Sequence, residues 1–159
     1  MHNSIIITSV QQAITNYNRC RAKLHDALLH YEGGDMITNT AVPPHVPVYY
    51  LELEPGSKGQ YNPNTRTITV SKDLDSAARI LTLTHESRHA WQHSVGMDMH
   101  TNYHDSEGNI DVLKYLLTPL EIDAREWELI HVNSYLDVLS KEEIDSTVLP
   151  KSWYKEYFN

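Results

Sequence analysis

The sequence has a single cysteine, Cys20, among its 159 residues. One thiol can form neither an internal disulfide framework nor a four-cysteine zinc site, so both are excluded. The lone thiol suits a reducing compartment. Because Cys20 also falls on the apolar face of an expected helix, we interpret it as a small buried apolar side chain.

Basic residues are scarce, because 13 Lys and Arg stand against 21 Asp and Glu, a formal net charge of -8. There is no basic stripe of the kind that binds a phosphate backbone, and an acidic surface repels nucleic acid and anionic lipid alike. We therefore expect neither nucleic acid nor a membrane as a partner. The net charge favours a neutral or basic substrate.

Long apolar runs are missing as well. No segment approaches the ~20 apolar residues that span a bilayer. The start, MHNSIIITSVQQ, lacks the basic region and long apolar stretch of a signal peptide. We expect a cytoplasmic protein. Since we find no repeat, low-complexity tract or long linker, residues 1–159 are expected to form one domain.

The first half of the chain predicts one long helix followed by a small sheet. Apolar residues recur at helical spacing over residues 8–31, up to the stop at Gly33-Gly34. Prolines at 43, 44 and 47 then exclude a helix. Residues 48–53 and 65–71 are predicted strands separated by turn-forming residues, and we expect them to form a hairpin.

The second half predicts helices. One covers residues 76–93, with Asp73 or Asp75 as its N-cap and an end at Gly96. After a polar loop that we expect to rim a cleft, helix resumes near residue 109 and restarts at Pro119. Thr118 is the expected N-cap there, and Glu121 completes a capping box. The aromatic residues after position 150 are expected to pack on the body, and the fold class is α+β.

The helix over residues 76–93 carries His85-Glu86-Ser87-Arg88-His89, which matches the pattern H-E-x-x-H. Positions i and i+4 lie on one helix face, so His85 and His89 can bind one ion. Glu86 is rotated by about 100° and can reach a metal-bound water instead. Zinc lowers the pKa of such a water from about 15.7 to about 7, which makes it a nucleophile for hydrolysis.

A solvated polar helix face is the alternative interpretation, because short motifs also arise by chance. The upstream residues argue against it, since Ala77, Leu81 and Leu83 make the helix apolar. Two histidines and a glutamate buried there without a function would be costly. Two other zinc patterns are excluded. The long H-E-x-x-H pattern needs glycine and histidine where Gln92 and Val95 stand, and deformylase-type sites need a cysteine ligand within motifs that are absent.

A catalytic zinc ion takes three protein ligands and one open position. His93 lies two turns along the same helix and cannot converge with the other two histidines on one ion, so we interpret it as a helix-end residue. The acids and histidines downstream supply the remaining candidates for the third ligand. These are Asp98, His100, His104, Asp105, Glu121, Asp123 and His131.

The segment LTLTHESRHAWQ, followed about 30 residues later by PLEIDAREWE, resembles the minimal gluzincin-type metallopeptidases, in particular the ImmA/IrrE-like group of bacteria and phages. The resemblance covers residues 46–130. It implies a minimal zincin-like domain, with H-E-x-x-H on one helix and a glutamate ligand on the next, within E-x-x-A-x-x-aromatic. Glu121, Ala124 and Trp127 reproduce that spacing, and the small Ala124 would let the two helices approach closely.

The resemblance implies a zinc-dependent peptidase. His85, His89 and Glu121 would hold zinc, and Glu86 would be the general base. Residues 65–71 would form an edge strand that holds an extended peptide substrate. Asp123 remains the alternative ligand, with Glu121 then confined to its capping box.

Other points stay open. Arg88 departs from the family pattern and needs an acidic partner, Asp123 or Glu128. The stabiliser of the reaction oxyanion would be His131, Tyr135 or Tyr115. The loop MDMHTNYHD could instead hold a second metal. Two other functions remain possible interpretations: a zincin-like scaffold that binds a regulatory partner, and a zinc amidohydrolase with a non-peptide substrate.

Overall fold

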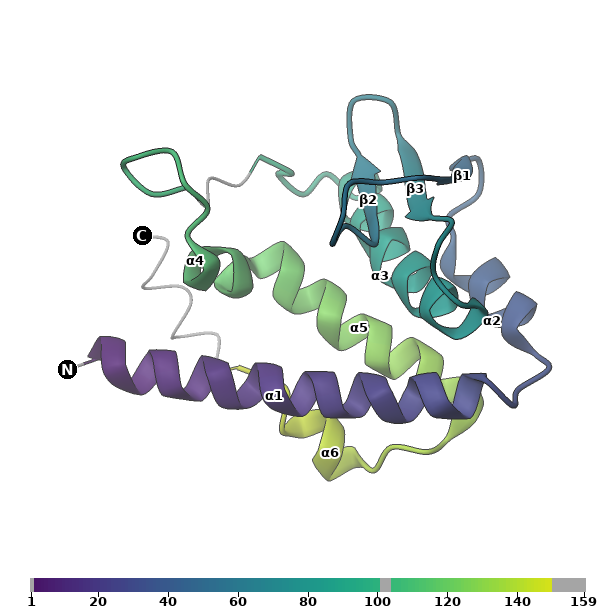
Figure 1. The fold of residues 1–159 in the computed structure, drawn as a ribbon, viewed down its shortest axis with the longest axis horizontal. Helices are drawn as coiled ribbons and strands as arrows, with labels where there is room; N and C mark the ends of the chain where they lie inside the picture. The colour runs from purple at the N-terminus through teal and green to yellow at the C-terminus, as the bar shows by residue number, and fades with distance from the viewer. Residues whose placement is uncertain (1, 101–103, 150–159) are drawn as a thin grey trace.

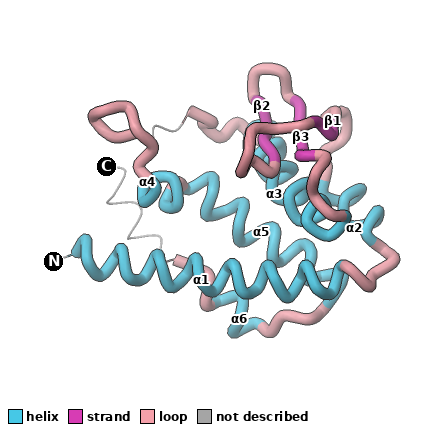
Figure 2. The backbone as a smooth tube through the Cα atoms, viewed as in Figure 1, coloured by secondary structure: helices cyan, strands magenta, loops and turns pink. Residues whose placement is uncertain are grey.

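The computed structural model describes residues 2–100 and 104–149. Figures 1 and 2 show a layer of helices with a small sheet on one side of it. The elements in chain order are α1 (His2–Leu28), α2 (Gly34–Ala41), β1 (Val48–Leu51), β2 (Gly59–Asn62), β3 (Thr67–Ser71), α3 (Ser76–Ser94), α4 (Val112–Leu117), α5 (Pro119–Leu136) and α6 (Lys141–Asp145). The α+β class is confirmed, as are the long first helix and the two helices that carry the motif residues.

Helix α1 uses the face that its apolar spacing predicts. Cys20, Leu24 and Leu28 are buried in one core cluster with residues of α2, α3 and α5. Nearer the N-terminus, Val10 and Ala13 are buried in a second cluster with residues of α4 and the end of the described chain. Helix α5 contacts both α1 and α3, so the three long helices form the body of the molecule (Figure 1).

The sheet has the strand order β1-β3-β2, so β3 is its central strand. Strand β1 runs parallel to β3, with Val48 opposite Ile68. Strand β2 is antiparallel to β3, with Tyr61 opposite Ile68. The hairpin expected between residues 48–53 and 65–71 is therefore wrong, because β2 is the hairpin partner. The expectation that residues 65–71 form an edge strand is wrong for the same reason.

The turn between β2 and β3 explains why the third strand starts later than predicted. The Asn62 side chain accepts hydrogen bonds from the backbone N–H groups of Asn64 and Thr65. Arg66 has a positive φ of 57° and donates its N–H to the Asn62 carbonyl. These residues are committed to the turn. Ile68 and Val70 then point into the core that β3 shares with α3.

Two further differences concern helix ends. The first helix ends at Leu28, before Gly33-Gly34, but a second helix that was not predicted, α2, begins at Gly34 and buries Ile37. Thr118 is the N-cap of α5 with Pro119 at its start, as predicted, but the capping box does not form. The Thr118 hydroxyl donates to the Lys114 carbonyl, and the Glu121 side chain is engaged elsewhere.

Across the described ranges, 2–100 and 104–149, no helix is both long and apolar enough to cross a membrane. The aromatic residues that were expected to pack on the body lie beyond position 150, outside the described residues.

Candidate metal centre

Helix α3 presents the H-E-x-x-H residues from the middle of the molecule. It begins where Asp75 accepts a hydrogen bond from the Ala78 N–H, 2.7 Å away, which identifies Asp75 rather than Asp73 as the N-cap. The helix is buried on two sides, with Leu81 packed against the other helices and Leu83 against the sheet. The helix is continuous through His85 and His89, so their side chains leave it one turn apart on the same face.

Helix α5 packs against α3 through residues spaced three or four positions apart, which share one face of α5. Glu121, Ala124 and Glu128 lie on this face, and each is buried. Ala124 has no exposed surface, which agrees with the prediction that a small residue lets the two helices approach. Glu121 stays 8% exposed, at the point where the face reaches an open cavity.

One carboxylate meets both histidines. The Glu121 oxygens lie 3.1 Å from His85 Nε2 and 2.7 Å from His89 Nε2. His85, His89 and Glu121 each offer one potential ligand atom, and these three atoms lie within 4.8 Å of one another. Among the residues that the structure describes, this is the only such group of three found. The loop that we considered as a second metal site contains residues 101–103, which lie outside the description.

The other ring nitrogen of each histidine is also held. His85 Nδ1 lies 3.0 Å from a Glu128 carboxylate oxygen, and His89 Nδ1 lies 2.8 Å from the Gln92 side-chain oxygen. Both acceptors favour a proton on Nδ1, which leaves Nε2 as the lone-pair atom of a neutral ring. Neither contact was expected from the sequence. Helical spacing could have suggested Gln92, three residues after His89, and Glu128, seven residues after Glu121.

Glu128 is the centre of a buried network that includes α1. Besides His85, it accepts hydrogen bonds from Tyr17 Oη at 2.7 Å and Arg21 Nε at 2.8 Å. Burial alone would raise the pKa of Glu128, but the His85 hydrogen bond and the Arg21 charge lower it. Glu128 is therefore ionised. No pattern in the sequence predicts that α1 contacts this site.

The site concentrates negative charge around the histidines. Burial would raise the pKa of Glu121, but hydrogen bonds to both histidines hold it well below its usual range. Burial would lower the pKa of His85, but its bonds to Glu121 and Glu128 raise it to about 10. Without a metal, protons on the histidines balance the carboxylates. A bound cation would take over that balance, since metal ligation requires deprotonated imidazole nitrogens.

Glu86 lies beside the cluster and keeps its carboxylate available. Within the described part of the chain, it has no hydrogen bond or ion pair. Burial raises the pKa of Glu86, against the lowering effect of the two histidines. Glu86 and His85 line a cavity of about 610 Å³, whose lining also includes Gly59 of β2. A second cavity, of about 320 Å³, is lined by His89, Glu121 and Tyr61 of β2.

Tyr115 is the oxyanion candidate that lies at the site. Its hydroxyl donates to Glu121 over 3.2 Å, and it lines both cavities. Burial and the Glu121 charge raise the pKa of Tyr115, so its hydroxyl stays protonated. His131 and Tyr135 instead bond to α2, through the Ile37 carbonyl and the Thr40 hydroxyl. Neither of them belongs to the three-residue group or lines either of the two cavities.

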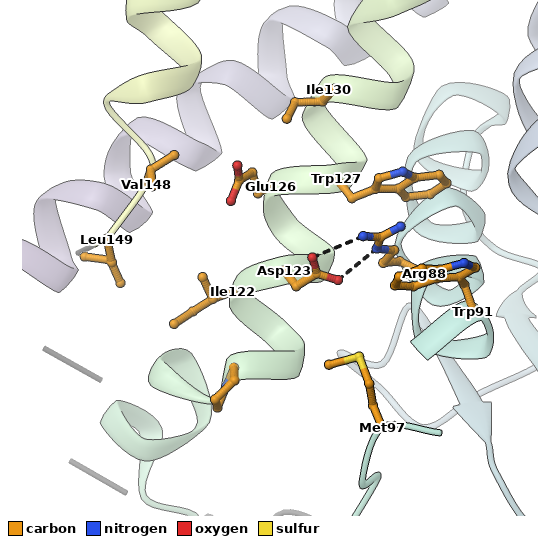
Figure 3. A pocket seen from close by; sticks show the side chains of 11 residues that line it. Arg88, Trp91, Met97, Ile122, Asp123, Glu126, Trp127, Ile130, Val148 and Leu149 are labelled. Carbon is orange, nitrogen blue, oxygen red and sulfur yellow. Dashed lines mark hydrogen bonds and ion pairs between the residues drawn. The ribbon is translucent and has the colours of Figure 1, made fainter. Parts of the chain in front are cut away.

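Arg88 finds its partner in Asp123. Its Nε lies 2.8 Å from one Asp123 oxygen, and its guanidinium lies 3.8 Å from the centre of the Trp91 ring. Figure 3 shows the guanidinium between Trp91 and Trp127, in a cavity of about 580 Å³ that is separate from Glu86. Asp123 also accepts a hydrogen bond from Gln92 Nε2. The alternative ligand Asp123 thus contacts the residue that holds His89.

The remaining histidines lie outside the cluster. His93 Nδ1 bonds to the Tyr61 hydroxyl over 2.7 Å, at the end of α3. His100 is exposed and lines the 320 Å³ cavity. His104 is exposed and forms a β-bridge with Ile110. None of these three belongs to the three-residue group.

The donor set fits a divalent metal. Two imidazole nitrogens and one carboxylate match the ligands of catalytic zinc, and bonds of about 2.1 Å place such ligands roughly 3.4 Å apart. The observed cluster, with all three ligand atoms within 4.8 Å, is compatible with that spacing. The contacts at both Nδ1 atoms supply the outer hydrogen bonds that histidine ligands normally make.

Residues 13–115 match the model of a family described as "Putative metallopeptidase family (DUF6782)". The match covers about two-thirds of the chain and includes His85, Glu86, His89 and Tyr115. Glu121 lies beyond it, so its assignment depends on geometry. No curated protein and no solved structure matches the chain.

Proposed function

The chain belongs to this metallopeptidase family, and from that premise we propose that it is a zinc-dependent peptidase of the H-E-x-x-H type. His85, His89 and Glu121 would hold the metal. The observation that carries the proposal is the convergence of two Nε2 atoms on one carboxylate, with both Nδ1 atoms held by other residues. The resemblance to ImmA/IrrE-like gluzincins supports the same ligand set.

Zinc, when bound, polarises the substrate carbonyl and makes a water molecule nucleophilic near neutral pH. The residues of this chain do the rest. Glu86 takes the proton from the attacking water and passes it to the leaving amine, because its carboxylate has no other partner in the described structure.

Tyr115 would stabilise the negative oxygen that develops on the substrate carbonyl. Its hydroxyl is held at the cluster by Glu121 and stays protonated, so it can donate a hydrogen bond to that oxygen. Strand β2 is an edge strand of the sheet, and its residues Gly59 and Tyr61 each line one of the two cavities. We assign β2 as the edge that pairs with an extended substrate, the role expected earlier of residues 65–71.

The test combines metal content with peptide hydrolysis. Wild-type protein purified with zinc should contain about one zinc ion per chain and should cleave peptides, as followed by mass spectrometry. Glu86→Gln should keep the zinc and lose at least about 100-fold in hydrolysis, since general base catalysis contributes about that much or more. Glu126→Gln makes the same change in the separate cavity of about 580 Å³ (Figure 3) and should leave zinc content and hydrolysis intact.

Two results would overturn the proposal. One is wild-type protein that contains no zinc although zinc was supplied. The other is a Glu86→Gln variant that hydrolyses peptides at the wild-type rate, because Glu86 would then have no role in proton transfer. A regulatory scaffold, by contrast, would keep its function in Glu86→Gln.

A further inference from the structure

The cavity of about 610 Å³ beside Glu86 is lined, on its side formed by α1 and the loop before β2, by hydrogen-bond donors. They are Asn18 and Arg21 of α1 and Ser57 and Lys58 of the loop. In the described structure, the side chains of Asn18, Ser57 and Lys58 make no hydrogen bond or ion pair. A wall of unused donors is suited to an acceptor group supplied by a ligand.

Arg21 is fixed but not fully used. Its Nε donates to Glu128 over 2.8 Å, and its Nη2 donates to the Thr82 hydroxyl over 3.2 Å. These two bonds hold the guanidinium plane in place. Its Nη1 has no partner among the described residues, and Arg21 lines the cavity. A planar guanidinium with a free edge suits a carboxylate.

Lys58 supplies a positive charge that the described structure leaves unpaired. Two other lysines, Lys23 and Lys72, lie within 4.0 Å of the carboxylates of Glu143 and Glu52. Lys58 is exposed, has no such acid nearby and lines the cavity.

The charges around the cavity favour an anion. Arg21 and Glu128 form an ion pair, so their charges cancel. Lys58 and Glu86 then balance each other. A divalent cation held by two neutral histidines and the Glu121 carboxylate would still carry a net positive charge beside the cavity. The chain as a whole has a formal charge of -8, so the cavity differs in sign from the molecule around it.

We propose that this cavity binds a carboxylate of the peptide substrate, with Lys58 as the specificity-determining residue and Arg21 as the fixed second donor. The inference rests on the proposed function, because the metal and Glu86 define the point of cleavage. The carboxylate comes from an Asp or Glu side chain or from the C-terminus of the peptide. The cavity therefore selects acidic peptides, in contrast to the neutral or basic substrate that the net charge suggested.

The experiment uses a proteome-derived peptide library, once with free and once with amidated C-termini. Zinc-loaded wild-type protein should cleave sites enriched about fivefold in Asp, Glu or a free C-terminus on one side of the bond, the effect expected of one exposed ion pair. Enrichment that survives amidation identifies side chains, and enrichment that amidation removes identifies the C-terminus. Lys58→Glu should lose the enrichment, whereas Lys72→Glu, outside the cavity, should keep it.

A binding measurement separates this inference from the proposed function. Immobilised Glu86→Gln protein should capture acidic peptides from the same libraries, and Glu86→Gln combined with Lys58→Glu should not. If wild-type protein cleaves no peptide, the proposed function fails, while the capture result still decides the preference of the cavity. Acidic peptides captured equally with and without Lys58→Glu, or no acidic enrichment in either assay, would overturn the inference.

Discussion

Glu128 and Gln92 hold the two histidines of the candidate site in different electrostatic states. His85 donates from Nδ1 to a buried carboxylate, whereas His89 donates to a neutral amide. A carboxylate partner makes an imidazole ligand more basic and fixes its orientation more strongly than an amide does. The charge of Glu128 is in turn stabilised by Arg21 and Tyr17 from α1. His85 is therefore the histidine whose metal affinity depends most on residues outside the motif.

We predict that Glu128→Gln weakens metal binding about 10- to 100-fold, because His85 loses its charged partner. The change also leaves Arg21 with a neutral partner in a buried position, so the variant should unfold more easily. Metal affinity is measured by competition with a chelator at a temperature where the variant is folded. Glu126→Gln, on the same helix but in the cavity of Figure 3, is the matched control. Equal affinities in both variants would contradict the prediction.

Single residues were predictable where they follow helix geometry. Helical spacing and the family resemblance together placed His85 and His89 on one face and Glu121 opposite them, and the structure brings these three together. Charge complementarity led to Asp123 as one of two partners for Arg88. Residues whose role depends on a distant helix gave no such signal. From the sequence, Tyr17 and Arg21 are ordinary residues of α1, because no sequence pattern predicts that this helix packs beside Glu128.

At the scale of elements, Asp75 fixes the start of the helix that carries the motif. We predict that Asp75→Ala lowers the free energy of unfolding by about 1 kcal/mol, the usual value for a lost N-cap. Asp73→Ala removes the neighbouring acid, which does not cap the helix, and should have little effect. Urea unfolding at pH 7 measures both. If both variants lose the same free energy of unfolding, the effect comes from removing a negative charge and not from removing the cap.

The Asp75 contribution should depend on pH in a defined direction. The Ala78 N–H and His25 lower the pKa of Asp75 in the folded protein. A carboxyl group with a lowered folded pKa stabilises the protein above its unfolded pKa of about 3.9 and loses that contribution as pH falls through the folded value. The difference between wild type and Asp75→Ala should therefore shrink when urea unfolding is repeated near pH 3. A constant difference would argue against an ionised cap.

Gly59 sets how closely β2 approaches α3. A Cβ atom at this position would lie 2.7 Å from the Thr82 methyl group and 3.0 Å from the Thr69 carbonyl oxygen. We predict that Gly59→Ala destabilises the protein by about 1–3 kcal/mol, as overpacking typically does. Thr82→Ser removes the methyl group but keeps the hydroxyl that accepts from Arg21, so it should recover part of the loss. Additive losses in a double-mutant cycle would show that the two residues do not collide.

Helices were easier to predict than strand pairing. The boundaries of α3 followed from its cap, its apolar spacing and Gly96, whose φ of 85° suits glycine. Strand β2 was missed because Gly59-Gln60-Tyr61-Asn62 contains one strong strand former and two weak ones. Its pairing depends on the turn at Asn62. Once β2 occupies one side of β3, β1 can pair only on the other side, where it runs parallel to β3.

At the scale of the whole molecule, the core and the candidate site are built from different residues. Three clusters of buried apolar side chains hold the helices and the sheet together. None of them includes His85, His89 or Glu121. Without metal, Glu121 still bonds to both histidines, so each of the three proposed ligands keeps a charged or hydrogen-bonding partner in the metal-free protein. The fold should therefore survive metal removal, unlike that of small zinc domains that unfold without their ion.

We predict that metal-free protein unfolds cooperatively and that zinc raises its Tm. Free zinc at about 100 times its Kd adds about 2.7 kcal/mol to the free energy of unfolding, which corresponds to roughly 5–10 °C for a chain of this size. The shift should decline as pH falls, because protons compete with zinc for the ring nitrogens. Differential scanning calorimetry with and without zinc measures it, and His85→Ala should abolish it. If the metal-free protein shows no cooperative transition, the fold itself depends on the metal. If zinc leaves the Tm of the wild-type protein unchanged, zinc does not bind tightly to the folded state.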